Sequence, residues 1–100
     1  MKKCTFYSLM RKDNRTQAVK HEGYTDGVYN YYNNGSARYP HWFAIEPSTG
    51  LSVVSDYTRK ATAEQAHKRA EAVKETLKRK ADVAAQLATL RAEAEAAQYV

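Results

Sequence analysis

The fold of this chain is decided by residues 62–97, which run TAEQAHKRAEAVKETLKRKADVAAQLATLRAEAEAA without a glycine or a proline. Apolar residues recur in the first part of this stretch at the i, i+4, i+7 spacing of one helix face. They are Ala66, Ala70, Val73, Leu77 and Ala81. Thr62 is followed three residues later by Gln65, a capping-box pattern that marks the start of a helix. The stretch predicts one long C-terminal helix, packed across a sheet by this first stripe.

Beyond Asp82 the largest apolar side chains form a second patch, roughly a quarter-turn around the helix axis from the first. The patch consists of Val83, Leu87, Leu90 and Ala94, with the spacing of a coiled-coil seam over about two heptads. A helix of this length is ~52 Å long, whereas a short strand spans ~20 Å. The distal part therefore overhangs, folds back at a break near Lys80 and Asp82, or meets another molecule. Val83, Leu87 and Leu90 are either core or interface, and a homodimer through this helix would suit both.

The first half of the chain has a different composition. Ten of the eleven aromatic residues lie in residues 1–57, whereas thirteen alanines lie in residues 61–97. Strand-forming residues and turn signals alternate before Tyr57, most clearly over 41–56, where Pro47–Gly50 separates two apolar runs. The sequence predicts a single α+β domain over 1–100, with an antiparallel β-meander of three to five strands in 1–57 and a helical region in 58–100. Phe43, Ile45, Leu51 and Val53 are expected on one face of the hairpin.

Composition excludes several protein classes. A single cysteine, Cys4, rules out an internal disulfide framework. No run of eighteen apolar residues and no secretory leader is present, so we expect a cytoplasmic protein. His21, His41 and His67 are too scattered for a zinc site, and neither a phosphate loop nor a nucleophile–base spacing occurs. We therefore expect no metal, no cofactor and no enzymatic activity.

Tyrosines concentrated between residues 24 and 42 suggest a binding surface. Tyrosine and tryptophan among Asn, Ser and Gly are typical of protein-binding surfaces. We expect partner contacts from some of Tyr29, Tyr31, Tyr32 and Tyr39, together with the distal helix patch Val83, Leu87 and Leu90. Trp42 and Tyr57 are expected in the core, because so small a domain needs large side chains there.

The basic residues of the helical region support a competing hypothesis. The net charge is +5, with +2 in residues 1–57 and +3 in residues 58–100. Nucleic acid would contact Arg38, His41 and the basic block of the helix, including Lys74, Lys78 and Arg79. Glu64–Lys68, Glu75–Arg79 and Lys78–Asp82 are spaced i, i+4, however, as in the ion pairs of an ordinary solvated helix face. The sequence thus favours a protein partner over nucleic acid.

Three segments, Trp42–Ile45, Thr49–Val53 and Thr58–Glu64, form a hairpin followed by a helix that opens with Thr and basic residues. Over roughly residues 40–75, this outline resembles small βα accessory proteins of bacteriophages and mobile elements, anti-CRISPR proteins among them. It is similar also to the sheet-plus-helix DNA-binding modules of phage integrases. Those modules carry Arg and Lys on their strands, whereas Trp42–Val54 has neither. The first resemblance implies a stoichiometric inhibitor of a host defence or repair machine, acting in the bacterial cytoplasm.

Overall fold

The computed structural model of the protein describes residues 1–79 and 81–97 and shows an α+β fold. Its five strands are β1 (Lys2–Lys12), β2 (Arg15–Thr25), β3 (Asn30–Asn33), β4 (Trp42–Ile45) and β5 (Ser52–Asp56). They form one antiparallel sheet in the order β1-β2-β3-β4-β5. The predicted β-meander is therefore confirmed, with each strand beside its neighbour in the sequence.

The long β1–β2 hairpin gives the sheet its curvature. Asp13 and Asn14 form its turn with φ angles of 53° and 61°, a left-handed conformation that Asp and Asn tolerate. At Gly23 an added Cβ would lie 2.0 Å from the Tyr31 carbonyl oxygen, so only glycine permits this close approach of β2 to β3. The Leu9 N–H donates to the Gly50 carbonyl at 2.8 Å, which ties the edge strand β1 to the β4–β5 turn.

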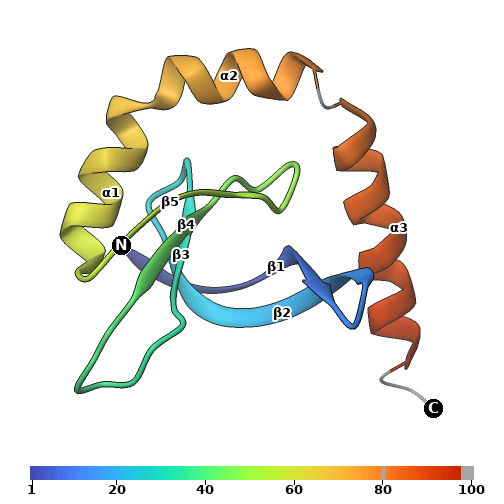
Figure 1. Ribbon diagram of the computed structural model, residues 1–100, viewed down its shortest axis with the longest axis horizontal. Helices are drawn as coiled ribbons and strands as arrows, with labels where there is room; N and C mark the ends of the chain where they lie inside the picture. The colour runs from blue at the N-terminus through green and yellow to red at the C-terminus, as the bar shows by residue number, and fades with distance from the viewer. Residues whose placement is uncertain (80, 98–100) are drawn as a thin grey trace.

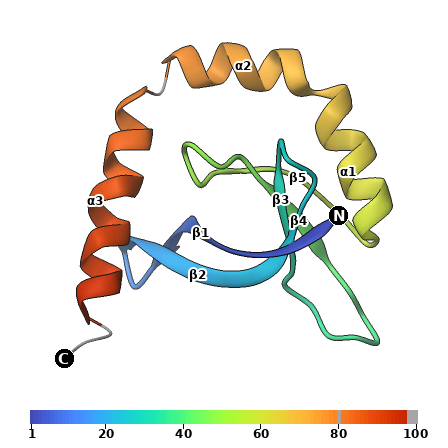
Figure 2. The ribbon, with the colours of Figure 1, turned by 180° about the vertical axis from the view of Figure 1, so that it is seen from behind.

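Three helices, rather than the one long helix predicted, form an arch around the sheet: α1 (Arg59–Lys68), α2 (Ala70–Arg79) and α3 (Ala81–Ala97) (Figures 1 and 2). A straight helix of ~52 Å would not fit a chain whose largest extent is 37 Å. The first break is at Arg69, whose φ and ψ of −96° and 8° leave the helical region. The break predicted near Lys80 falls between α2 and α3, at a residue outside the described part of the chain.

Helix α1 begins one turn earlier than the sequence predicts. Thr58 is its N-cap, because the Thr58 hydroxyl accepts a hydrogen bond from the Ala61 N–H at 3.1 Å. Thr62, the predicted cap, is instead fully buried inside the helix and donates to the Thr58 carbonyl at 2.7 Å. The Gln65 side chain donates to the Asp56 carboxylate instead of closing a capping box. The predicted capping box is therefore wrong.

Apolar side chains pack on both faces of the curved sheet. One cluster, against α1, consists of Tyr29, Tyr31, Ala44, Val54 and Ala66. The other, on the opposite face, consists of Phe6, Tyr32 and Ile45. The predicted 41–56 hairpin is confirmed, but the register shifts between Ala44 and Ile45. Phe43 and Ile45 therefore belong to the second cluster while Val53 packs against the first, contrary to the single face that strand alternation predicted.

Two of the three helices bury side chains in the sheet. Helix α1 packs on β4 and β5, and α3 packs on β1 and β2. On α3, Leu87 is only 7% exposed and lies against Gly50, where an added Cβ would be 3.0 Å from Leu87 Cδ1. Gly50 has a φ of 70°, which glycine adopts without strain. Helix α2 joins these two packed helices and has no buried residue of its own.

Candidate functional site

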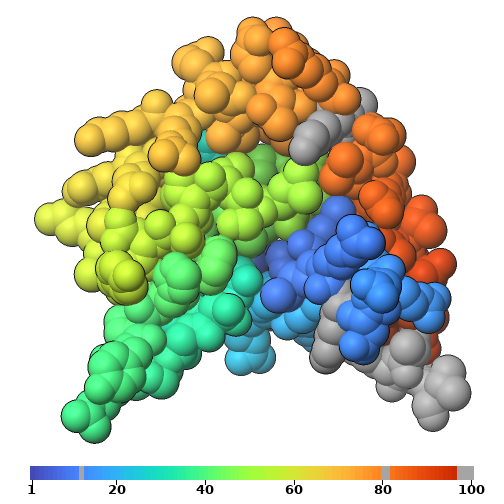
Figure 3. Space-filling view, in the orientation of Figure 1, coloured from blue at the N-terminus to red at the C-terminus, as the bar shows by residue number. Residues whose placement is uncertain are grey.

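An apolar groove lies between α2 and the β4–β5 hairpin. Its volume is about 280 Å³. Val73 and Leu77 line it from α2, and Leu51 and Val53 line it from the hairpin. All four side chains are half-buried, so each keeps part of its surface open to the groove. Figure 3 shows the two elements facing each other on one side of the molecule, with α2 in orange and the hairpin in yellow-green.

The sequence of α2 explains why the groove is apolar. Ala70, Val73 and Leu77 follow one another at helical spacing, and charged residues occupy five of the other seven positions, which makes α2 the most amphipathic of the three helices. Such a face ordinarily packs into a core. Here α1 and α3 are held on distant strands, and α2 spans the distance between them (Figure 1). The apolar face of α2 is therefore only partly covered: Val73 packs against the first cluster, but no side chain of α2 is fully buried.

A buried carboxylate, that of Glu46, lines the groove. Glu46 is 8% exposed, and its oxygens accept hydrogen bonds from the backbone N–H groups of Ser48 and Thr49 at 3.0 and 2.7 Å. The Ser48 and Thr49 hydroxyls also donate to it, at 2.8 and 2.7 Å. Burial raises the pKa of Glu46, but these hydrogen bonds outweigh it and hold the pKa below its ordinary value. Glu46 thus stabilises the turn as an ionised side chain whose acceptors are already used.

The outer surface of α1 and α2 is basic. Residues 59–79 contain seven Lys and Arg residues against three Glu. Among them the structure has one ion pair, between Lys74 and Glu71 at 3.4 Å. The pairs Glu64–Lys68, Glu75–Arg79 and Lys78–Asp82 do not form within the described residues, so the prediction of a self-paired helix face is wrong. Arg69 lines the groove and is likewise without an ion pair in this part of the chain.

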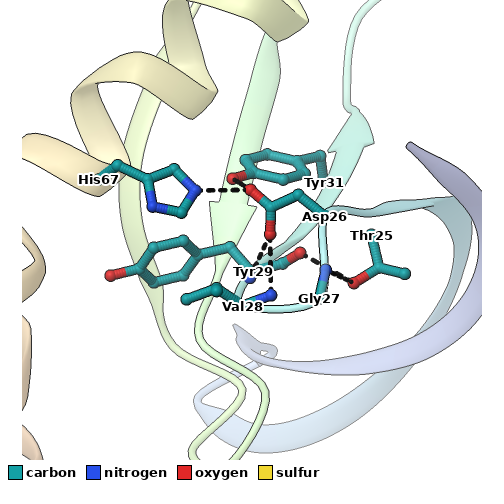
Figure 4. A network of polar contacts seen from close by, with 7 residues as sticks. All are labelled: Thr25, Asp26, Gly27, Val28, Tyr29, Tyr31 and His67. Carbon is teal, nitrogen blue, oxygen red and sulfur yellow. Dashed lines mark hydrogen bonds and ion pairs between the residues drawn. The ribbon is translucent and has the colours of Figure 1, made fainter.

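A second polar network fastens α1 to the sheet (Figure 4). The Asp26 carboxylate accepts hydrogen bonds from the Tyr31 hydroxyl at 2.5 Å and from His67 Nε2 at 2.7 Å. The backbone N–H groups of Val28 and Tyr29 donate to its other oxygen at 2.9 and 2.8 Å. Burial raises the pKa of Asp26, but the four hydrogen bonds outweigh burial and bring the pKa to about 2. The network therefore joins the β2–β3 loop, β3 and α1 through one ionised carboxylate.

One serine lies against a histidine, as in nucleophilic catalysis. Ser8 Oγ and His21 Nε2 are 2.6 Å apart. Ser8 is only 1% exposed, however, and the His21 ring is stacked on Tyr32 with 3.9 Å between ring centroids. Burial lowers the pKa of His21, which favours the neutral ring. A substrate has no access to this hydroxyl, so the pair stabilises the interior of the sheet and offers no reactive group.

Aromatic rings continue from this interior pair to the surface. Tyr32 stacks on Phe43 with 5.6 Å between ring centroids. The centroid distance is 4.8 Å from Phe43 to His41 and 5.9 Å from His41 to Tyr57, on which His41 stacks. Tyr57 is 74% exposed, so its predicted place in the core is wrong. Trp42, by contrast, is partly buried against the first cluster, and Arg59 lies over its ring. His41 and Tyr57, the outermost rings of this series, are therefore exposed aromatic side chains on the far side of the sheet from α1.

The structure moves most of the predicted tyrosine surface into the core. Tyr29, Tyr31 and Tyr32 are 3%, 0% and 7% exposed, so they offer no surface to a partner. The reason is size, since a domain of 100 residues fills its core with its few large rings. Tyr39 is 71% exposed beside the Arg38 guanidinium, so it stands on the surface, where its role as a partner contact stays a prediction.

The fold also buries part of the distal helix patch. Leu87 is core, whereas Val83 and Leu90 are half-buried on α3. The predicted interface patch therefore loses its central residue. Lys74, Lys78 and Arg79 are exposed on α2, while Arg38 and His41 are exposed in the β3–β4 loop, which extends away from α2 (Figures 1 and 2). These five residues do not form one surface.

Sequence reasoning missed the groove itself. It assigned Val73 and Leu77 to core packing, and Val73 does pack against the first cluster. It assigned Leu51 and Val53 to a sheet face, and it gave Arg69 no role. No pattern in the sequence marks a helix whose apolar face the sheet covers only in part. Among the described residues, no cluster of three metal-ligating side chains occurs and no helix is long and apolar enough to cross a membrane. The chain matches no protein-family model, and neither a curated protein nor a solved structure is significantly similar to it.

Proposed function

We propose that this chain is a non-enzymatic protein-binding module that acts through the groove between α2 and the β4–β5 hairpin. One observation carries the proposal: the most amphipathic helix of the domain buries no residue, and its apolar face lines an open groove. A domain of this size has little apolar surface to leave unused. An apolar surface that the fold keeps open is typical of an interaction site.

The dimensions of the groove favour side chains of a partner over a small ligand. A volume of about 280 Å³ is at the lower limit of the pockets that hold drug-sized molecules, about 300–1,000 Å³. The carboxylate that lines it, Glu46, already accepts hydrogen bonds from Ser48 and Thr49. A small ligand would therefore find few groups to orient it. A partner protein needs only to insert apolar side chains, as a peptide segment does in a groove.

A role as a phage-type inhibitor is compatible with this mode of action. A protein that binds without catalysis acts in proportion to its amount, so it would block a host defence or repair machine by occupying a surface of it. This role rests on the resemblance to phage accessory proteins given above. The experiment that it requires is the identification of the partner protein.

A nucleic-acid partner is the second candidate. It is favoured because the described basic residues of α1 and α2 form only one ion pair with Glu, Lys74–Glu71. Lys74, Lys78 and Arg79 are exposed on α2 and belong to a segment with an excess of basic residues. Arg38 and His41 would form a separate contact. Phosphate contacts make affinity fall steeply with salt. Fluorescence anisotropy with single- and double-stranded oligonucleotides at low salt tests this candidate directly, and no detectable binding there eliminates it.

The protein-binding proposal is tested by comparing two variants of equal charge change. Leu77→Asp places a carboxylate in the groove, whereas Ala85→Asp places one on the exposed side of α3. We expect the wild type and Ala85→Asp to capture the same protein from an extract of the native cells, at a fixed ratio by native mass spectrometry. Leu77→Asp should lose it while keeping the wild-type circular dichroism spectrum. Equal capture by all three proteins would contradict a role for the groove.

A further inference from the structure

We infer that the groove binds a segment of the partner protein in which apolar side chains are flanked by carboxylates. This inference rests on the proposed function and adds the chemistry of the partner. The apolar part is set by Leu51, Val53, Val73 and Leu77, which line both walls of the groove. Its length is short, because about 280 Å³ holds only a few side chains.

The charge of the partner follows from the surroundings of the groove. The segment that contains α1 and α2 has seven basic and three acidic residues, and one of the three, Glu71, is paired with Lys74. Arg69 lines the groove at the junction of α1 and α2 and makes no ion pair among the described residues. A basic partner would be repelled by this surface, whereas carboxylates beside an apolar contact would be attracted to it.

Glu46 does not reverse this preference. Glu46 lies at the groove, but the residue is only 8% exposed. Its carboxylate accepts hydrogen bonds from four donors, the backbone N–H groups and the hydroxyls of Ser48 and Thr49. A lysine or arginine of a partner would have to displace those donors to reach it, which leaves buried polar groups without partners. Arg69, in contrast, is exposed and can receive a carboxylate without any such loss. The accessible charge of the site is therefore positive.

Panning of a display library of short random peptides on the immobilised full-length protein tests the inference. We expect enriched peptides to combine two or more large apolar residues with Asp or Glu. The selected peptide is then synthesised and titrated by fluorescence anisotropy. Leu77→Asp should weaken its binding about tenfold or more, because it places a charge in the apolar contact. Ala85→Asp should leave binding unchanged. Leu77→Gln serves in place of Leu77→Asp if the latter loses its fold.

The charge is tested with Arg69→Gln and with the peptide itself. Arg69→Gln should weaken binding about two- to fivefold at low salt, the size of an exposed ion pair, and by less as salt is added. Replacing the acidic residues of the peptide by their amides should have a similar effect and should add little to Arg69→Gln. Enriched peptides that are neutral or basic, yet depend on Leu77, would overturn the acidic partner and leave protein binding through the groove intact. Enriched peptides indifferent to Leu77, or no enrichment, would overturn both.

Discussion

Helices α2 and α3 bury side chains in the reverse order of their amphipathicity. The α2 segment has the clearest apolar stripe of the chain, and it buries no residue. The α3 segment is rich in alanine on all sides and nearly without amphipathicity, yet Leu87 in its middle is buried against Gly50. An apolar stripe thus predicts which face of a helix would be buried. It does not predict that the fold brings a surface to bury it.

The geometry of the sheet explains the difference. Strands β1 and β2 curl toward the β4–β5 turn, and Leu9 and Gly50 meet there by a backbone hydrogen bond. Leu87 packs over this meeting point, where glycine leaves room for it. Helix α2 has no equivalent, because it crosses from the strands under α1 to the strands under α3 (Figure 2). Leu87 is buried between α3 and the sheet, whereas Val73 and Leu77 of α2 stay half-buried along the groove.

The largest expected effect comes from Leu87. Leu87→Ala removes a buried side chain between α3 and the sheet, and the loss of packing with a residual cavity costs about 2–4 kcal/mol of unfolding free energy. Urea denaturation followed by circular dichroism measures it. A cost below about 1 kcal/mol would mean that α3 is held by something other than Leu87.

Substitution of Gly50, which lies against Leu87, is expected to have the next largest effect on the unfolding free energy. Gly50→Ala puts a Cβ 3.0 Å from Leu87 Cδ1 and 3.1 Å from the Leu9 nitrogen, on a backbone with a φ of 70°. The strain should cost about 1–3 kcal/mol. In the Leu87→Ala background the same substitution should cost less, because the clash with Leu87 is gone. Equal costs in both backgrounds, determined as a double-mutant cycle, would show that the two sites do not interact.

Asp26 makes stability depend on pH at the α1 end of the arch. Its folded pKa of about 2 lies below the ordinary value near 3.9, so its contribution is complete above about pH 5 and is lost progressively as the pH falls through 2. The difference corresponds to roughly 2.5 kcal/mol. Urea midpoints between pH 5 and pH 2 should fall for the wild type, and they should fall less for Asp26→Asn. Parallel curves for the two proteins would contradict an ionised Asp26 in the network.

The smallest expected effect comes from Leu77. Leu77→Ala removes a half-buried side chain that faces an open groove, so the unfolding free energy should change by less than about 1 kcal/mol. Thermal and urea unfolding of the wild type and the variant give this value. A loss of 2 kcal/mol or more would place Leu77 in the core, and the groove would then be a packing defect instead of a binding surface.

Much of the fold could be predicted because its signals are local. The turn residues Pro47–Gly50 and the apolar runs beside them gave the β4–β5 hairpin, and the lack of Gly and Pro after Gly50 gave the helical region. The change of apolar face after Ala81 also had structural meaning, since a new helix with a different packing surface begins there. The helical region also folds back (Figure 1), which is one of the three outcomes that its length predicted.

The candidate site could not be predicted because it depends on distances between elements. The tyrosine pattern could not distinguish core from surface, so it placed Tyr31 outside and Tyr57 inside, the reverse of what the structure shows. The register shift at Ala44 and Ile45 moved Val53 to the other cluster without any signal in its own segment. Helical spacing likewise suggested ion pairs such as Glu64–Lys68, but two long exposed side chains at that spacing need not meet.

The most direct test compares the urea denaturation of Leu77→Asp and Leu87→Asp. The two variants carry the same Leu-to-Asp change, one on α2 and the other on α3. If α2 holds an open apolar face and α3 closes the core, Leu77→Asp keeps the unfolding free energy within about 1 kcal/mol of the wild type, while Leu87→Asp loses more than about 3 kcal/mol or does not fold. Equal losses for the two variants, or a larger loss for Leu77→Asp, would contradict the account.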